Sequence, residues 1–244
     1  MAEKIYTIPI NEAFDEYDGC PMCRLRATLD EQAVTYVMGA AMMEPDVRIR
    51  TNKLGFCRRH FDAMMAQKNR LSLALILESH LDVVASQFPG GEEQSSSMLG
   101  KVKKFNGDAG LEPIAAQAAS CFVCARVAEF ESQYRSNVIH LWKRDQSFRE
   151  KLRKQPFFCL EHYVQLLTEA QAALSEDAFL TFRKELTSVM TDYLNQLRAD
   201  NSSFCKSFDH ENAHKPLTEA QKTSVGRAVS FLAGAPRPTV QKKK

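Results

Sequence analysis

The chain has 244 residues, of which 44% are hydrophobic and 25% are charged. This composition is typical of a globular protein with a packed core, and it excludes collagen-like, fibrous and wholly disordered chains. Lysine and arginine number 32 and aspartate and glutamate 30, a net charge of +2, so charge alone does not favour nucleic acid or an anionic membrane as a partner. The unusual feature is the seven cysteines.

The first twenty residues carry acidic side chains and lack the apolar core of a secretory signal. The apolar runs at 34–43 and 71–77 are shorter than the roughly 20 residues that a membrane-spanning helix requires. We therefore expect a cytoplasmic protein that does not cross a membrane. In that reducing compartment, cysteines more often bind metals or take part in redox chemistry than form structural disulfides.

A pair of short cysteine motifs occurs twice. Cys20-Pro-Met-Cys23 is followed, after 33 intervening residues, by Cys57-Arg-Arg-His60. Cys121-Phe-Val-Cys124 is followed, after 34, by Cys159-Leu-Glu-His162. The offset between the copies is 121 − 20 = 101 residues at the first motif and 159 − 57 = 102 at the second, which indicates an internal repeat.

The residues around the motifs have helical periodicity. One apolar stripe predicts a long amphipathic helix and runs through Val127, Phe130, Tyr134, Val138, Leu141, Phe148 and Leu152. A second stripe, from Phe179 to Leu197, follows Ser175 as a helix N-cap. Thr218 and Gln221 have the spacing of a capping box that opens a last helix. We therefore expect an all-α fold.

Residues 89–113 concentrate glycine, serine and charge without an apolar period, as in a linker. The predicted organisation follows from this segment and the repeats. It comprises a first CxxC/CxxH helical repeat at 1–88, the linker at 89–113, a second repeat at 114–200, and a C-terminal helical segment with a basic tail at 201–244.

The two motifs together offer the ligands of a tetrahedral metal site. A CxxC brings two thiolates onto one turn, and a CxxH at the start of a helix adds a third sulfur and an imidazole, a set that suits zinc. Pro21 fits the first position of a helix, and Pro156 predicts a chain reversal before the second CxxH. The predicted ligands of two structural zinc ions are Cys20, Cys23, Cys57, His60, Cys121, Cys124, Cys159 and His162.

How these ligands are grouped is a separate question. We favour closure within each repeat, so that the CxxC at 20–23 shares an ion with the CxxH at 57–60, and the motifs at 121–124 and 159–162 share the other. A crossed arrangement, in which the CxxC of one repeat is completed by the CxxH of the other, is the alternative. Redox dithiols and an iron or iron–sulfur site are the alternatives to zinc.

Two further patterns have weaker support. His210-Glu-Asn-Ala-His214 matches HExxH, whose Glu211 would be the general base of a metallopeptidase. Pro216 ends any helix soon afterwards and no later histidine offers a third ligand, so this is a minor alternative. Six basic side chains lie between 143 and 154, but we interpret them as a solvated helix face and do not expect nucleic-acid binding.

Several segments resemble an uncharacterised bacterial family, a domain of unknown function from anaerobic Firmicutes. They are EKIYTIPINEAF, CPMC, DVRIRTNKLGFCRRHF, CFVC and PFFCLEHY. Members are sometimes labelled as ABC transporter substrate-binding proteins, a label that would require an export signal. The resemblance extends over most of the chain and implies a bacterial cytoplasmic protein with no catalytic residues to carry over.

These observations lead to a functional expectation. No complete catalytic constellation is present, so we expect a non-catalytic binding or regulatory module with two zinc ions and a protein or small-molecule partner that the sequence does not identify. The rival is a thiol redox protein or a redox-switched zinc protein, because zinc-bound thiolates are already deprotonated.

Overall fold

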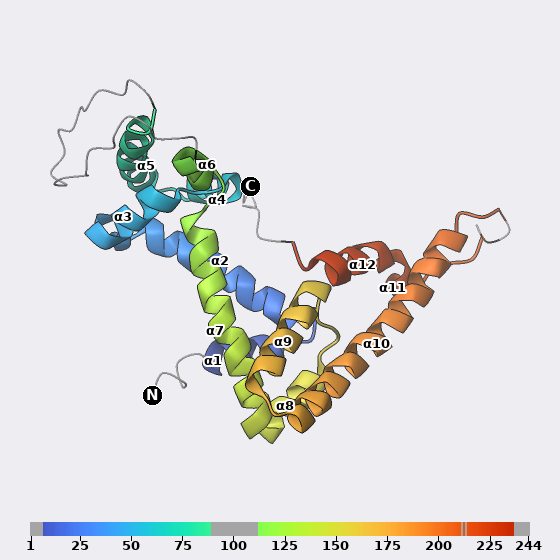
Figure 1. Ribbon diagram of the computed structural model, residues 1–244. Coiled ribbons are helices and arrows are strands. Elements are labelled where there is room, and N and C mark those ends of the chain that lie inside the picture. Colours follow the sequence, from blue (N-terminus) through green and yellow to red (C-terminus); the bar gives the residue numbers. More distant parts are fainter. Residues whose placement is uncertain (1–6, 89–111, 211, 213, 237–244) are drawn as a thin grey trace. The chain divides into compact units, whose positions relative to one another are not determined.

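The computed structural model describes residues 7–88, 112–210, 212 and 214–236 (Figure 1). Over these residues the chain forms twelve α-helices, one short 3-10 helix and no strand, which confirms the all-α prediction. Most of the predicted linker at 89–113 and the basic tail from 237 onward lie outside the described residues. No helix in the described part of the chain combines the length and apolar character that crossing a bilayer requires.

The helices group into two compact units. The first comprises Met1–Thr28 and Phe130–Arg237, and the second comprises Leu29–Glu129. The division between the units falls inside two helices, α2 (Pro21–Met38) and α7 (Phe122–Arg144). Each unit therefore combines segments from both sequence repeats, and the units do not coincide with the repeats at 1–88 and 114–200.

The first unit is built around its longest helix, α10 (Glu176–Lys206). The helices that pack on α10 are α8 (Gln146–Lys154), α9 (Leu160–Ala173), α11 (Glu219–Lys222) and α12 (Ser224–Ala233). α1 (Thr7–Asp15) packs on α8. Aromatic rings fill the interior: the ring centroid of Phe14 lies 4.8 Å from that of Phe148 and 6.1 Å from that of Phe158.

Two helices that the apolar periodicity predicts as continuous are each divided in two in this unit. The single helix predicted through Leu152 is two helices, because α7 ends at Arg144 and Asp145 accepts hydrogen bonds from the backbone N–H groups of Ser147 and Phe148 as the N-cap of α8. Thr218 and Gln221 do form the predicted capping box, but it opens the four-residue α11, and α12 follows as a separate helix. The apolar stripe of α7 continues across the first break through the buried Phe148 and Leu152 of α8.

Over the described residues, the second unit contains five further helical elements and the remainder of α2 and α7. They are η2 (Ala40–Met43), α3 (Pro45–Leu54), α4 (Arg58–Ala66), α5 (Arg70–Ala85) and α6 (Glu112–Ala118). Gly55 ends α3 with φ at 57°, a left-handed conformation that favours glycine, and a Cβ there would lie 3.1 Å from the His80 ring. The Gly55 carbonyl accepts a hydrogen bond from the Phe122 N–H at 2.9 Å. This turn therefore places Cys57 beside the start of α7.

The aromatic core of the first unit should contribute several kcal/mol to its stability. Phe148 is fully buried, whereas Phe208 is 77% exposed. We expect Phe148→Ala to lower the free energy of unfolding by about 3–5 kcal/mol, because it leaves a cavity. The matched Phe208→Ala should change it by less than about 0.5 kcal/mol. Urea unfolding followed by circular dichroism measures both, and equal losses would contradict this core.

Candidate metal centres

Each CxxC motif lies at the start of a long helix. Cys20 directly precedes α2, and its carbonyl accepts hydrogen bonds from the N–H groups of Cys23 and Arg24 at 3.1 and 3.3 Å. At the start of α7, the N–H of Cys124 approaches the Sγ of Cys121 at 3.5 Å. Both thiols of each motif are thus gathered on the first turn, where the helix dipole favours negative charge.

Each CxxH motif also opens a helix, as predicted. Cys57 is the N-cap of α4 and Cys159 is the N-cap of α9. His60 and His162 follow three residues later, so sulfur and imidazole project from the same first turn.

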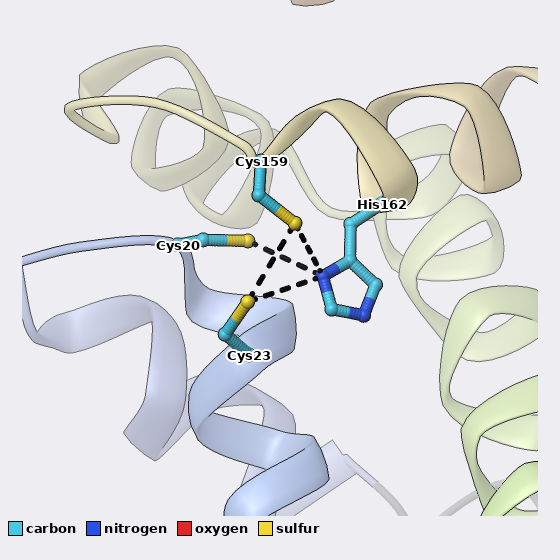
Figure 2. A group of neighbouring side chains, drawn as sticks. All are labelled: Cys20, Cys23, Cys159 and His162. Carbon is cyan, nitrogen blue, oxygen red and sulfur yellow. Dashed lines mark hydrogen bonds between the residues drawn. The ribbon is translucent and has the colours of Figure 1, made fainter. Parts of the chain in front are cut away.

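The eight predicted ligands form two clusters, each within one compact unit. Site 1 contains Cys20, Cys23, Cys159 and His162, as Figure 2 shows, and site 2 contains Cys57, His60, Cys121 and Cys124. Within each cluster the donor atoms all lie within 4.8 Å of one another. The grouping within each repeat that we favoured is therefore wrong, and the crossed alternative is found.

The lengths of the helices explain the crossing. After Cys20 the chain enters α2, which has 18 residues, and then α3, which has 10. At 1.5 Å per residue these helices span about 27 Å and about 15 Å. The two helices between these motifs thus differ in length by about 12 Å, which disfavours closure of Cys20 with Cys57. The second repeat has the same imbalance, with 23 residues in α7 and 9 in α8.

The imidazole is the closest common neighbour of the three thiols in site 1. The His162 Nδ1 lies 3.0 Å from the Cys159 Sγ, 3.4 Å from the Cys23 Sγ and 3.6 Å from the Cys20 Sγ. The sulfurs of Cys23 and Cys159 are 3.6 Å apart.

Site 2 has nearly the same geometry. The His60 Nδ1 lies 3.1 Å from the Cys121 Sγ, 3.3 Å from the Cys57 Sγ and 3.5 Å from the Cys124 Sγ. The sulfurs of Cys57 and Cys124 are 3.9 Å apart.

Most of these distances are equal to or shorter than the edges of a zinc tetrahedron, by up to about 0.6 Å. With Zn–S bonds of about 2.3 Å and a Zn–N bond of about 2.0–2.1 Å, sulfur corners lie about 3.8 Å apart, and sulfur and nitrogen about 3.6 Å. Two Cys3His clusters that could hold metal ions are therefore present.

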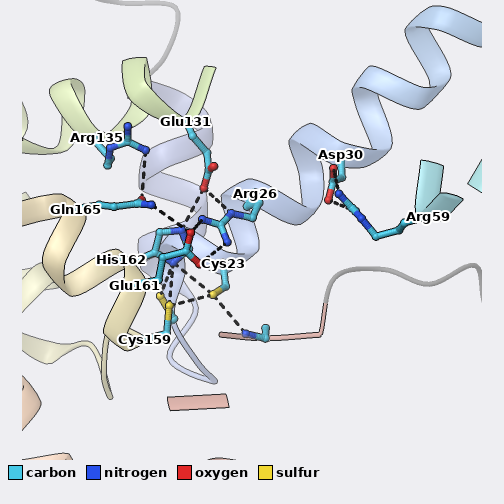
Figure 3. A network of polar contacts seen from close by, with 12 residues as sticks. Cys23, Arg26, Asp30, Arg59, Glu131, Arg135, Cys159, Glu161, His162 and Gln165 are labelled. Carbon is cyan, nitrogen blue, oxygen red and sulfur yellow. Dashed lines mark hydrogen bonds and ion pairs between the residues drawn. The ribbon is translucent and has the colours of Figure 1, made fainter. Parts of the chain in front are cut away.

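A buried carboxylate orients the imidazole of site 1 (Figure 3). The Nε2 of His162 lies 3.1 Å from a Glu131 carboxylate oxygen, which also accepts a hydrogen bond from the Arg26 Nε at 2.7 Å. Arg26 donates two further hydrogen bonds to Glu161, each at 2.9 Å. Burial opposes ionisation of Glu131, but the hydrogen bonds from His162 and Arg26 hold its pKa below the usual range. This ionised partner keeps the proton on Nε2 and leaves Nδ1 free to bind a metal.

Asp30 does the same for site 2. The His60 Nε2 lies 3.0 Å from one Asp30 carboxylate oxygen, and Arg59 donates to both oxygens at 2.7 and 3.3 Å. Our sequence reasoning missed Asp30 and Glu131, although a signal was present. Each acid lies ten positions after the first cysteine of its repeat (30 − 20 and 131 − 121).

The thiols in each cluster cannot all ionise without a cation. Burial raises the pKa of Cys121, but the hydrogen bond with His60 outweighs it and brings the pKa to about 6. Burial and the Cys121 charge raise the pKa of Cys124 to about 12. In site 1, hydrogen bonds from neighbouring thiols lower the pKa of Cys23, whereas burial raises that of Cys20. A divalent cation stabilises all three thiolates at once, so the donor set fits zinc.

The two sites differ in access to solvent. All four residues of site 1 are buried. The backbone N–H of Ala235 donates a hydrogen bond to the Cys23 Sγ at 3.4 Å. A Cβ on Gly234, where φ is 82°, would lie 3.3 Å from that sulfur. In site 2, by contrast, Cys57 and Cys124 are partly exposed.

The weaker sequence patterns have different outcomes. α10 ends at Lys206, and His210 and His214 are exposed and lie in turns, while Glu211 lies outside the described residues. The described part of the HExxH segment therefore lacks the helical geometry that a metallopeptidase needs. Cys205, the seventh cysteine, is exposed and belongs to neither cluster.

The basic stretch at 143–154 covers the end of α7 and all of α8, within the first unit. Phe148 and Leu152 are fully buried, as predicted. Arg149 and Arg153 both form ion pairs with Glu185. Lys151 also pairs with Asp15, so three of its six cations are engaged within the protein.

The carboxylate behind each imidazole should strengthen metal binding. We expect Glu131→Gln to lower the zinc affinity of site 1 by about 10–100-fold, because the amide cannot hold the imidazole with a negative charge. Glu129→Gln is the matched control, since Glu129 lies on the same helix and is exposed. Competition with a chromogenic chelator measures both affinities. Equal affinities in the two variants would refute the role of Glu131.

The turn at Gly234 should also affect site 1. A side chain in the left-handed conformation costs about 1–2 kcal/mol, and a Cβ there contacts the Cys23 sulfur. We therefore expect Gly234→Ala to weaken zinc binding at site 1 about 5–30-fold and to leave site 2 unchanged. Gly226→Ala, in α12 with open space around the new methyl group, should not weaken either site. The same chelator competition tests this, and unchanged binding in Gly234→Ala would contradict it.

Comparison with known proteins identifies a family but no activity. Neither the curated proteins nor the solved structures contain a significant match. A family model described as a family of unknown function, DUF6062, matches residues 1–238. Both pairs of cysteine motifs lie within the matched region. The chain therefore belongs to the DUF6062 family.

Proposed function

We propose that the protein binds two zinc ions, one in site 1 and one in site 2, and acts as a non-catalytic binding or regulatory module. The observation that carries this proposal is the spacing of the donor atoms, since in each site three sulfurs and one nitrogen lie within 4.8 Å of one another, close enough to share one tetrahedral zinc ion. Bound zinc supplies a cross-link in each unit. Four protein ligands leave no coordination position for water or substrate.

The separation of the ligands along the chain supports a structural role. Cys23 and Cys159 are 136 residues apart, and Cys57 and Cys124 are 67 apart. Structural zinc contributes about 10–16 kcal/mol of apparent binding free energy, which rivals the roughly 5–15 kcal/mol total stability of a typical protein. The folded state of each unit would then depend on its ion.

The carboxylates that contact the Nε2 atoms of the two imidazoles support a zinc site over a redox dithiol. Both imidazoles present Nδ1 to the sulfurs and Nε2 to a buried carboxylate, the arrangement of a carboxylate–histidine–zinc site. A thiol redox centre needs two thiols but does not require an imidazole whose Nδ1 faces the sulfurs. We place the protein in the cytoplasm, where reducing conditions keep the ligand thiols available for metal.

Metal analysis is the direct test. Protein purified without added metal should contain about two zinc ions per chain and give a colourless solution. Visible charge-transfer bands would point instead to iron. A folded chain without metal would overturn the proposal.

Paired substitutions test the crossed grouping. In Cys20→Ser/Cys159→Ser both changes fall in site 1, so we expect about one zinc per chain and a helical spectrum retained by the second unit. Cys20→Ser/Cys57→Ser damages both sites and should retain almost no zinc. Grouping within repeats would give the opposite result, because Cys20 and Cys57 would then share an ion.

A further inference from the structure

The two clusters offer their sulfurs to solvent very unequally. In site 1, Cys159 and His162 are fully buried and Cys20 and Cys23 are 5% and 7% exposed. Site 2 buries His60 and Cys121 but leaves Cys57 and Cys124 partly exposed. Cys57 and Cys124 are therefore the most exposed of the eight ligand residues, whereas all four residues of site 1 are buried.

The two accessible sulfurs lie in positive surroundings. Cys57 caps the N-terminus of α4, and Cys124 is in the first turn of α7. The Arg59 guanidinium lies beside the Cys124 thiol as well as pairing with Asp30. A zinc ion in site 2 would hold both sulfurs as thiolates, the reactive form of cysteine.

The same two sulfurs are close enough to react with each other. Their Sγ atoms are 3.9 Å apart, and a disulfide requires about 2.05 Å. A shift of about 2 Å at the ends of two partly exposed side chains is enough to close this gap.

We propose that Cys57 and Cys124 are a peroxide-reactive pair, whose oxidation releases zinc from site 2 while the covered site 1 keeps its ion. This inference rests on the proposed function, since it requires zinc in both sites. It adds a modification site and names the class of reagent, a hydroperoxide.

The reaction balances with one peroxide for each pair. The Cys57 thiolate attacks a peroxide oxygen, the O–O bond breaks, and sulfenic acid and one hydroxide form. The Cys124 thiolate then attacks the sulfenic sulfur and displaces a second hydroxide, forming the disulfide. The two sulfurs lose two electrons and the peroxide gains them. Zn²⁺ is left with two of its four ligands and dissociates.

The test uses the full-length, zinc-loaded protein in a Cys205→Ser background, because Cys205 is an exposed thiol that would also consume peroxide. One equivalent of hydrogen peroxide is added. A chromogenic chelator follows zinc release, and peptide mass spectrometry maps the disulfides. We expect release of about one zinc per chain, a Cys57–Cys124 disulfide, and recovery of two-zinc protein after dithiothreitol and added zinc.

Several results would overturn the inference. They are the absence of zinc release, loss of both ions together, and a first disulfide within site 1 or between Cys121 and Cys124. The zinc content before peroxide separates the two proposals. Fewer than two ions per chain at that stage means that the proposed function has failed, whereas two ions that resist peroxide mean that only this inference has failed.

A matched pair of variants tests the reason for the selectivity. Phe231 is buried and anchors α12 against the rings of Phe157 and Tyr193, with centroids 5.9 and 5.8 Å away. Phe231→Ala should loosen the segment that covers site 1 and raise peroxide-driven zinc release toward two ions per chain. Phe208→Ala, at an exposed ring, should keep release at one. Equal release from both variants would contradict protection by the C-terminal segment.

Discussion

Three thiols packed around one imidazole cannot all ionise unless a cation offsets the repulsion between the thiolates. The first thiolate to form discourages the next, so that the pKa values of Cys121 and Cys124 separate to about 6 and about 12. Much of the fold is arranged around this constraint. Helix N-termini face the sulfurs, and buried carboxylates stand behind the rings. A divalent cation completes both clusters because its charge offsets the thiolates.

The duplicated design has diverged in its supporting charges. Asp30 and Glu131 occupy equivalent places, yet the arginine that neutralises each comes from a different element. Arg59 lies inside the first CxxH, whereas the second has Glu161 at that position and Arg26 of α2 reaches across to it. Both repeats therefore keep a carboxylate–arginine pair beside the imidazole. The arginine comes from the CxxH motif in the first repeat and from α2 for Glu131.

The sequence predicted which residues form the clusters better than it predicted which of them share a cluster. The ligand types, the helix starts at Pro21 and after Ser175, and the all-helical class follow from local rules of spacing and capping. The grouping of ligands depends instead on how far α2 and α7 run before the chain turns back, which no local pattern reveals. Asp30 and Glu131 each share a helix with another acid, Glu31 in α2 and Glu129 in α7, and alignment of the two repeats singles them out.

The crossed grouping sets an order of assembly during synthesis. Site 2 has all its ligands once Cys124 has left the ribosome, but the first CxxC must wait for His162, and its cover at Gly234 emerges later still. In that interval the only complete set available to Cys20 and Cys23 is the wrong one, with Cys57 and His60. Early zinc capture within the first repeat would thus be a kinetic trap. Rapid folding of α2 guards against it, because the formed helix extends the chain by about 27 Å between the first CxxC and the next motif.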